Sequence, residues 1–355
     1  MPIQLENKHT VGTDGQLFNG RFTPCGNYLV AGGFDGQLHR WKLSDGEPAE
    51  LPPISGHQGW AQAFAFHPSE TRVYSTDSWV NIACMYYTLE KPQAQWTHHL
   101  GHDGWIRGIQ LTTAGDTFVT CGRDQAVRRF KSKNGKLLNE YLGHQADVYC
   151  LAIHPTSQTL VSADAVGTII VWDTKKQVPH RKFDASELFM KHRLQDVGGV
   201  KTMTFSPDGK TLLAAGTRPS GGGNVQGIPL ILGFDWASGE KLFSRELGGK
   251  AEVYVQDMRF HPEGYLIAVT SGNPGTGQLL FIDLDQAEPT YKNNTLANCH
   301  AVSVHPNGRT LAVTATSKGS NGNGRRLDKD GNYLGNSSPI YLFQPADPTS
   351  TDPAP

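Results

Sequence analysis

The best group of potential metal ligands in this sequence is His98-His99-Leu100-Gly101-His102. Imidazole nitrogens are common ligands of zinc, so neighbouring histidines of this kind could hold an ion. On a β-strand, however, successive side chains point to opposite faces, and His98 and His99 could not easily share one ion. The sequence also lacks the Gly-x-Ser-x-Gly and His-Glu-x-x-His patterns of hydrolases. We therefore expect no catalytic residues, no metal site and no cofactor.

The overall charge is nearly balanced, which bears on the class of partner. The 355 residues carry a formal net charge of -1, and the isoelectric point is near 6.9. A strongly basic chain would favour nucleic acid or an anionic membrane surface as a partner, and this chain is not strongly basic. The pair Arg325-Arg326 is too small to indicate nucleic acid, and residues 272–277 lack the Gly-Lys-Ser/Thr ending of a phosphate-binding loop. We expect neither nucleic acid nor a membrane as a partner.

The amino-terminal residues and the cysteines indicate the compartment. The sequence MPIQLENKHT has no basic segment followed by an apolar run. No window approaches the length of about 18 apolar residues that a membrane span needs. The 5 cysteines lie far apart and include no Cys-x-x-Cys pair, as is typical of free thiols in a reducing compartment. We expect a cytoplasmic protein that is a monomer on its own.

The elements that must position any functional residue are short β-strands in a repeated unit. Residues 148–173, VYCLAIHPTSQTLVSADAVGTIIVWD, contain three short apolar runs separated by turn residues, which predicts three antiparallel strands. The turn after the first strand recurs along the chain as Thr23-Pro24, His67-Pro68, Thr113-Ala114, His154-Pro155, Ser206-Pro207, His261-Pro262 and His305-Pro306. Apolar residues alternate along each first strand and should fill the seams between units. Seven such units predict an all-β ring of ordinary propeller size.

The unit at residues 148–173 resembles a WD40 repeat, because Gly143-His144 precedes it and Trp172-Asp173 closes it. The resemblance implies a seven-bladed WD40-like β-propeller. We expect a single such domain over residues 1–344. Its blades are predicted near residues 16–55, 60–100, 105–142, 148–183, 200–247, 253–292 and 299–344, the last together with residues 2–10.

The two ends of the chain should meet in the last blade. The seventh unit ends at Gln344, and its outer strand is missing from the carboxyl-terminal side. Residues 2–10 precede the first blade and can supply that strand, which would leave no open edge in the ring. The Pro-, Asp- and Thr-rich residues 345–355 are expected to be a disordered tail.

The family resemblance also implies structural roles for several His, Asp and Trp residues. In WD40 blades, the His of a Gly-His pair hydrogen-bonds an Asp in the turn between the second and third strands, alongside a hydroxyl and a Trp. The corresponding residues are His57 with Asp77 and Ser75, His102 with Asp124 and Thr120, and His144 with Trp172. Ala83 and Phe130 occupy the Trp positions of blades two and three, and Val166 the Asp position of blade four. We therefore expect incomplete networks.

Four insertions should lie on one face, above blades four to seven, at residues 184–199, 217–229, 271–277 and 317–339. Two interpretations are open. The insertions are either tolerated surface loops without a partner, or a wall around a binding site, since long loops without a role are uncommon. In the second case their charges would come from Arg218, Lys318, Arg325, Arg326 and Lys329.

The mouth of the central channel is the main candidate site. By the resemblance, partners bind residues that flank the first core position of each inner strand. These are Phe18, Trp60, Gln62, Trp105, Arg107, Asp147, Tyr149, Lys201, Tyr254, Gln256, Asn298 and His300, and Trp79 in the turn of blade two extends the surface. Aromatic side chains with Arg and Lys at a concave opening suit a peptide or an acidic motif. Alternatively, Trp60 and Trp105 only shield the connection between blades.

These features predict a non-catalytic WD40-repeat scaffold that binds protein or peptide partners through the channel rim and the inserted loops of blades four to seven. The alternative is a propeller enzyme of hydrolase or lactonase type, with a metal at the channel mouth held by Asp147, Gln256, Asn298 and His300. A third possibility is an adaptor in a larger assembly. The family signals such adaptors by Trp-Asp-x-Arg, and the chain has Trp172-Asp173-Thr174-Lys175, with Lys in place of Arg.

Overall fold

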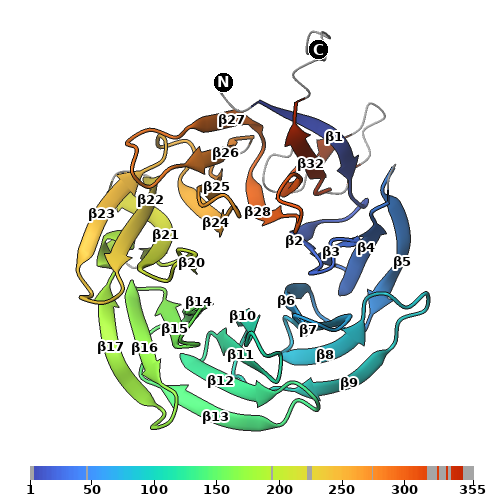
Figure 1. Cartoon of the computed structure of the whole chain (residues 1–355), viewed down its shortest axis with the longest axis horizontal. Helices are drawn as coiled ribbons and strands as arrows, with labels where there is room; N and C mark the ends of the chain where they lie inside the picture. The colour runs from blue at the N-terminus through green and yellow to red at the C-terminus, as the bar shows by residue number, and fades with distance from the viewer. Residues whose placement is uncertain are drawn as a thin grey trace.

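Seven four-stranded antiparallel sheets are arranged around a central axis (Figure 1). In the computed structural model, the described residues are 4–44, 47–192, 195–221, 226–273, 275–317, 326–327, 333–334 and 337–346. Within them the only helix is one 3₁₀ turn, η1 (Ser186–Leu188), and no helix is long and apolar enough to cross a membrane. The chain is an all-β propeller with seven blades, as the repeats predicted.

Blades one to six are each built from consecutive strands, with the first nearest the channel and the fourth outermost (Figure 1). Blade one contains β2 (Leu17–Phe22), β3 (Tyr28–Gly33), β4 (Gln37–Lys42) and β5 (Ala49–Ser55), and blade two contains β6 (Ala61–Phe66), β7 (Arg72–Asp77), β8 (Asn81–Tyr86) and β9 (Ala94–His99). Blade three contains β10 (Ile106–Leu111), β11 (Thr117–Gly122), β12 (Ala126–Lys131) and β13 (Leu137–Leu142), and blade four contains β14 (Val148–Ile153), β15 (Leu160–Asp164), β16 (Thr168–Asp173) and β17 (Val178–Asp184). Blade five contains β20 (Thr202–Phe205), β21 (Thr211–Ser220), β22 (Gln226–Asp235) and β23 (Lys241–Glu246), and blade six contains β24 (Tyr254–Phe260), β25 (Leu266–Ser271), β26 (Gly277–Ile282) and β27 (Tyr291–Leu296).

Blade seven is completed by the first strand of the chain. Its inner three strands are β28 (Cys299–Val304), β29 (Leu311–Ala315) and β32 (Ile340–Pro345), and β1 (Leu5–Val11) pairs with β32 on the outside. Leu5 pairs with Pro345, and Val11 pairs with Ile340. The predicted closure by the amino-terminal strand is thus confirmed. The strand begins at Leu5 rather than at residue 2, and Pro345 belongs to the sheet instead of the tail, while residues 347–355 lie outside the described residues.

The apolar faces of neighbouring blades pack against each other. One buried cluster joins blades four and five and includes Val171, Phe205 and Phe234. Another joins blade seven to blade one and includes Leu342 and Leu17. Because each sheet has apolar residues on both faces, a blade can bury them only between two neighbours. Every seam is therefore filled only when the ring closes.

Three of the expected loops contain paired strands. Residues 184–199 contain η1 followed by the paired strands β18 (Phe189–His192) and β19 (Gln195–Gly198). The prediction of a loop over residues 217–229 is wrong at both ends, because β21 and β22 continue into it and Thr217 pairs with Pro229. Gly, Pro and Ser indicated a turn, but the two arms pair with each other and satisfy their own backbone groups. In residues 317–339, β30 (Arg326–Leu327) pairs with β31 (Tyr333–Leu334).

Candidate functional site

The inner strands surround a central cavity of about 330 Å³. The predicted rim residues that line it are Phe18, Gln62, Arg107, Tyr149, Lys201, Gln256 and His300. The other predicted rim residues, Trp60, Trp79, Trp105, Asp147, Tyr254 and Asn298, are not part of this lining. The predicted rim is therefore divided between residues inside the cavity and residues around its opening.

A β-bulge positions most of the residues that line the cavity. In six blades, one residue near the start of the inner strand has no partner on the second strand, and the register shifts there. The unpaired residues are Phe18, Gln62, Arg107, Tyr149, Gln256 and His300. In blade five, Lys201 holds the equivalent place directly before β20, where its N–H donates to Ala215 O. Because a bulge re-aims a side chain, each blade presents one of these residues to the cavity.

Aromatic rings cover the rim over blades one to three. Phe18 stacks on Phe34 with ring centroids 4.2 Å apart, and Phe34 lies 4.9 Å from Trp60. Trp60 in turn lies 5.5 Å from Trp105. We call these four residues the aromatic arc. Trp60 is 38% exposed, and Trp79, in the nearby turn of blade two, is 59% exposed. Trp side chains are mostly buried in folded proteins, so this degree of exposure is unusual.

Phe34 was not predicted, although its position in the turn could have revealed it. Its N–H donates to Gln16 O, just before the inner strand of blade one. The N–H groups of Ser78 and Arg123 make the same bond to the carbonyls of Trp60 and Trp105. The residue that follows the second strand therefore lies beside the start of the inner strand in each of these blades.

Cations and tyrosines alternate along the rim over blades three to six. The Arg107 guanidinium lies 5.1 Å from the Trp105 ring centre and 5.6 Å from that of Tyr149. The Lys201 ammonium lies 4.9 Å from the Tyr149 ring centre and 5.4 Å from that of Tyr254. Such contacts stabilise a cation modestly. Burial nevertheless lowers the pKa of Lys201, and the positive charge of Arg107 lowers it further.

A buried ion pair lies deeper in the cavity, and sequence reasoning did not find it. Arg21 of blade one lies 2.6 Å from Asp257 of blade six, and Arg259 lies 3.6 Å from the same carboxylate. Asp257 also accepts the N–H of Val302 in blade seven, whose carbonyl accepts from Arg21. Burial alone would raise the pKa of Asp257, but the two arginines hold it below its usual value.

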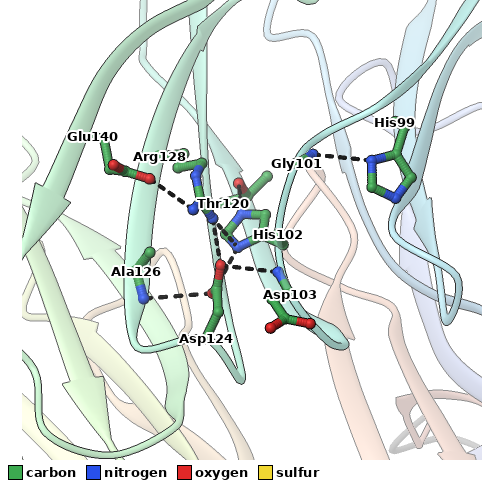
Figure 2. A network of polar contacts seen from close by, with 9 residues as sticks. All are labelled: His99, Gly101, His102, Asp103, Thr120, Asp124, Ala126, Arg128 and Glu140. Atoms are coloured by element: carbon green, nitrogen blue, oxygen red, sulfur yellow. Dashed lines mark hydrogen bonds and ion pairs between the residues drawn. The ribbon is translucent and has the colours of Figure 1, made fainter.

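The His–Asp networks lie away from the cavity, between the second strand and the preceding connection. In blade three, His102 Nδ1 lies 2.8 Å from Asp124 Oδ1, and His102 Nε2 lies 2.7 Å from Thr120 Oγ1 (Figure 2). Arg128 contacts Asp124 at 2.5 Å and Glu140 at 2.6 Å. Burial alone would raise the pKa of Asp124, but hydrogen bonds from His102 and Arg128 hold it well below its usual value. Arg128 thus supplies a partner in a network that lacks the Trp.

The network of blade four is complete, so the expectation based on Val166 is wrong. Trp172 Nε1 donates to Ser162 Oγ at 2.8 Å, and Ser162 Oγ lies 2.7 Å from His144 Nε2. His144 Nδ1 donates to Asp164 at 2.9 Å. The carboxylate comes from the end of β15, two positions before Val166, and still reaches the imidazole.

Blade two uses the same placement of the carboxylate as blade four. Asp77 ends β7 and accepts the N–H of Trp79 at 2.9 Å, while His57 Nδ1 lies 3.5 Å from Asp77 Oδ2. His57 Nε2 lies 2.7 Å from Ser75 Oγ. The buried Ala83 at the Trp position supplies no indole partner to this network.

Comparison with known proteins agrees with these networks. Residues 92–130 and 135–173 match the model of the WD40 family, described as WD domain, G-beta repeat. Two segments of this seven-bladed β-propeller therefore match the WD40 repeat. A guanine nucleotide-binding protein subunit beta of Nicotiana plumbaginifolia is 26% identical over 285 residues, which cover 76% of this chain and 66% of the relative.

Other similar proteins match a shorter part of the propeller. The eukaryotic translation initiation factor 3 subunit I of Aspergillus fumigatus is 26% identical over 121 residues, 34% of this chain and 32% of the relative. That of Neurospora crassa is 28% identical over 121 residues, with the same coverage. The matched segment therefore spans about a third of this chain and about a third of the length of each of these relatives.

Three of the four residues considered as metal ligands, Asp147, Asn298 and Gln256, have separate partners in the propeller. Asp147 pairs with Arg123 at 3.1 Å, and Asn298 Oδ1 accepts the N–H of Gly272. Gln256 Nε2 donates to Ser271 Oγ at 2.6 Å, and burial lowers the pKa of His300. In the part of the chain that the structure describes, no group of three or more His, Cys, Asp or Glu residues is placed to hold a metal ion.

The histidines at positions 98, 99 and 102 also have separate partners. His98 Nε2 donates to Asn134 O, and His99 Nδ1 accepts the N–H of Gly101. Figure 2 shows His99 apart from the His102 network. The three side chains are therefore not brought together.

Of the charged residues predicted in the insertions, Arg218 has partners within the propeller. Arg218 was predicted to supply charge to a partner, but it pairs with Glu246 at 2.5 Å and with Glu187 at 3.1 Å. It thereby ties η1 to blade five. Lys318, Arg325 and Lys329 lie outside the described residues, and Arg326 belongs to β30.

Proposed function

We propose that this WD40 propeller is a non-catalytic scaffold that binds a protein or peptide partner at the channel rim. The observation that carries the proposal is the exposure of Trp60 and Trp79 beside a polar cavity. Large exposed aromatic side chains mark interaction surfaces, and Trp is enriched among residues that dominate binding energy. The relatives' names describe subunits, one of a guanine nucleotide-binding protein and one of an initiation factor, which supports a role within an assembly.

The two halves of the rim indicate the chemistry of the partner. The aromatic arc over blades one to three offers apolar surface, and Arg107 and Lys201 offer positive charge next to it. A segment with an apolar side chain followed by acidic ones would complement both halves. The partner is therefore proposed to present such a segment to the channel mouth.

The proposal includes a cytoplasmic, monomeric protein. All 5 cysteines are free, and Cys84, Cys121, Cys150 and Cys299 are buried, which suits a reducing compartment. The edge of blade seven is covered by β1, which supports a ring that needs no second copy to complete it.

Partner capture tests the proposal. A variant with Trp60, Trp105 and Arg107 replaced by Ala should retain the fold, and affinity purification with mass spectrometry should recover fewer partners than the native chain. The binding of each recovered partner is then measured with purified proteins. A control variant, Leu138→Ala with Leu142→Ala, removes exposed apolar side chains from the outer strand β13 and should bind normally. Unchanged affinity in the rim variant would exclude the rim as the site.

A further inference from the structure

Arg107 and Lys201 face the same tyrosine in the central cavity. The Arg107 guanidinium lies 5.6 Å from the Tyr149 ring centre, and the Lys201 ammonium lies 4.9 Å from it. Both cations line the cavity, and neither is fully exposed. Two positive charges are thus held on one aromatic ring, where water screens their repulsion less than at an open surface.

Neither cation has a carboxylate partner among the described residues. Among the described residues that line the cavity, Asp257 is the only one with a carboxylate, and it is already held by Arg21 at 2.6 Å and Arg259 at 3.6 Å. Asp147, on the neighbouring rim, pairs with Arg123. The buried Nε of Arg107 has no hydrogen-bond partner in the described part of the chain.

An uncompensated pair of this kind destabilises the fold unless something neutralises it. Removing a charge from water is costly, and the cost is offset only by an opposite charge or by hydrogen bonds. Burial and the charge of Arg107 both lower the pKa of Lys201, which is the signature of an ammonium without a counter-charge. Charged groups in a cavity whose pKa is shifted by burial and by a like charge are typical of binding sites.

We propose that Arg107 and Lys201 bind one oxyanion group, a carboxylate or a phosphate, beside Tyr149 at the mouth of the channel. The Arg107 guanidinium lies over the rings of Trp105 and Tyr149, and its terminal N–H groups are the donors for two oxygens of the anion. Lys201 adds a point charge. Gln62 lines the same cavity, and its side-chain NH₂ group is a further hydrogen-bond donor there.

The oxyanion has two possible sources. It is either a free anion of small size or an acidic side chain of the bound partner, and only the second source rests on the proposed function. Inorganic phosphate and a six-residue glutamate peptide are the two probes, with a six-residue glutamine peptide as the neutral control. Each is titrated into the purified full chain at constant ionic strength, with binding followed by calorimetry and by the melting temperature.

The native chain should bind at least one acidic probe saturably, with a rise in melting temperature. Arg107→Met and Lys201→Met should each weaken that binding by at least about tenfold, the effect of losing one charge-assisted contact. Lys176→Met, which removes an exposed lysine of blade four, is the matched control and should bind as the native chain does. Binding of phosphate identifies a free anion as sufficient, and binding of the glutamate peptide alone identifies the acidic side chain.

A second readout separates binding from general stability. Without any probe, Lys201→Met should melt at a higher temperature than the native chain, because the variant no longer holds an unneutralised ammonium in the cavity. The proposal is overturned if neither acidic probe binds, if both variants bind within twofold of the native chain, or if Lys201→Met melts at a lower temperature. Capture of a partner plays no part in these measurements. A rim variant that still captures its partner therefore contradicts the proposed function and leaves the oxyanion site standing.

Discussion

His305 donates its Nε2–H to the backbone carbonyl of Gly26, 2.9 Å away, and so joins the last blade to the first. The other ring nitrogen, Nδ1, accepts the N–H of Asn307 and fixes the imidazole in its own turn. The same contact recurs around the ring, with His154 donating to Gly209 O at 3.0 Å and His261 to Gly308 O at 2.6 Å. The His-Pro turns that revealed the repeat therefore also connect one blade to the next.

Gly26→Ala should destabilise the propeller at this junction. Gly26 has a φ of +77°, and an added Cβ would lie 2.6 Å from His305 Nε2, so both backbone strain and displacement of the imidazole are expected. We expect a loss of about 2 to 3 kcal/mol in the free energy of unfolding, measured with urea. Gly264→Ala is the control, because Gly264 also has positive φ, at +97°, but has open space around it. It should lose only about 1 kcal/mol. Equal losses would contradict a role for the His305 contact.

Asp124→Asn should reduce the dependence of stability on pH. The pKa of Asp124 is lower in the fold than in the unfolded chain, so its contribution is present above the unfolded value of about 3.9 and is lost as pH falls through the folded value. The variant should be less stable by about 2 kcal/mol at pH 7, with a difference that shrinks below about pH 4. Urea unfolding across this range measures it. The exposed Asp285→Asn serves as the control, and a constant difference at all pH values would argue against the ion pair.

Arg21→Met should loosen blade seven more than Arg259→Met does. Arg21 contacts both Asp257 and the carbonyl of Val302, whereas Arg259 lies 3.6 Å from Asp257 and its side chain is 40% exposed. Breaking the close, buried pair should lower the free energy of unfolding by about 3 kcal/mol. Hydrogen exchange of β28 amides should also become faster in Arg21→Met. Similar effects of the two substitutions would mean that Arg21 does not hold blade seven.

Deletion of residues 1–11 should expose the outer edge of β32. The deleted segment contains all of β1, whose pairing runs from Leu5 with Pro345 to Val11 with Ile340. An open edge of this kind pairs with other chains, so we expect aggregation in light scattering and a lower melting temperature. A synthetic peptide of residues 4–12, added in excess, should restore the monomer. A truncated chain that stays monomeric and melts normally would show that β1 is dispensable.

The fold was predictable because the repeat carries its own evidence. Turns such as His154-Pro155 recur in each blade, and strands that pair within a blade are close in sequence. The closure of blade seven was predictable because the seventh unit lacks its outer strand and residues 2–10 precede the first blade. The hairpin of β21 and β22 was not predicted, since its Gly and Pro residues indicate a turn equally well whether the flanking arms pair or not.

The cavity lining was predictable in position but not in its contacts. The family register placed Arg107 and Lys201 at the channel, because it depends only on distance from the first core residue of the strand. The pair of Arg21 and Asp257 lies 236 residues apart in sequence and forms only in the closed ring. Phe34 was missed because a turn residue shows no periodicity, and Asp164 because the carboxylate can enter the network from either of two backbone positions.

At the unpaired position near the start of six inner strands, the side chain that faces the cavity can change without a change in the pairing of the sheet. Because these residues have no partner on the adjoining strand, exchanging their side chains leaves the cross-strand hydrogen bonds intact. A combinatorial library randomised at residues 18, 62, 107, 149, 256 and 300 would then sample new specificities on one unchanged frame. The same freedom lets related chains diverge in what they recognise while they keep a common architecture.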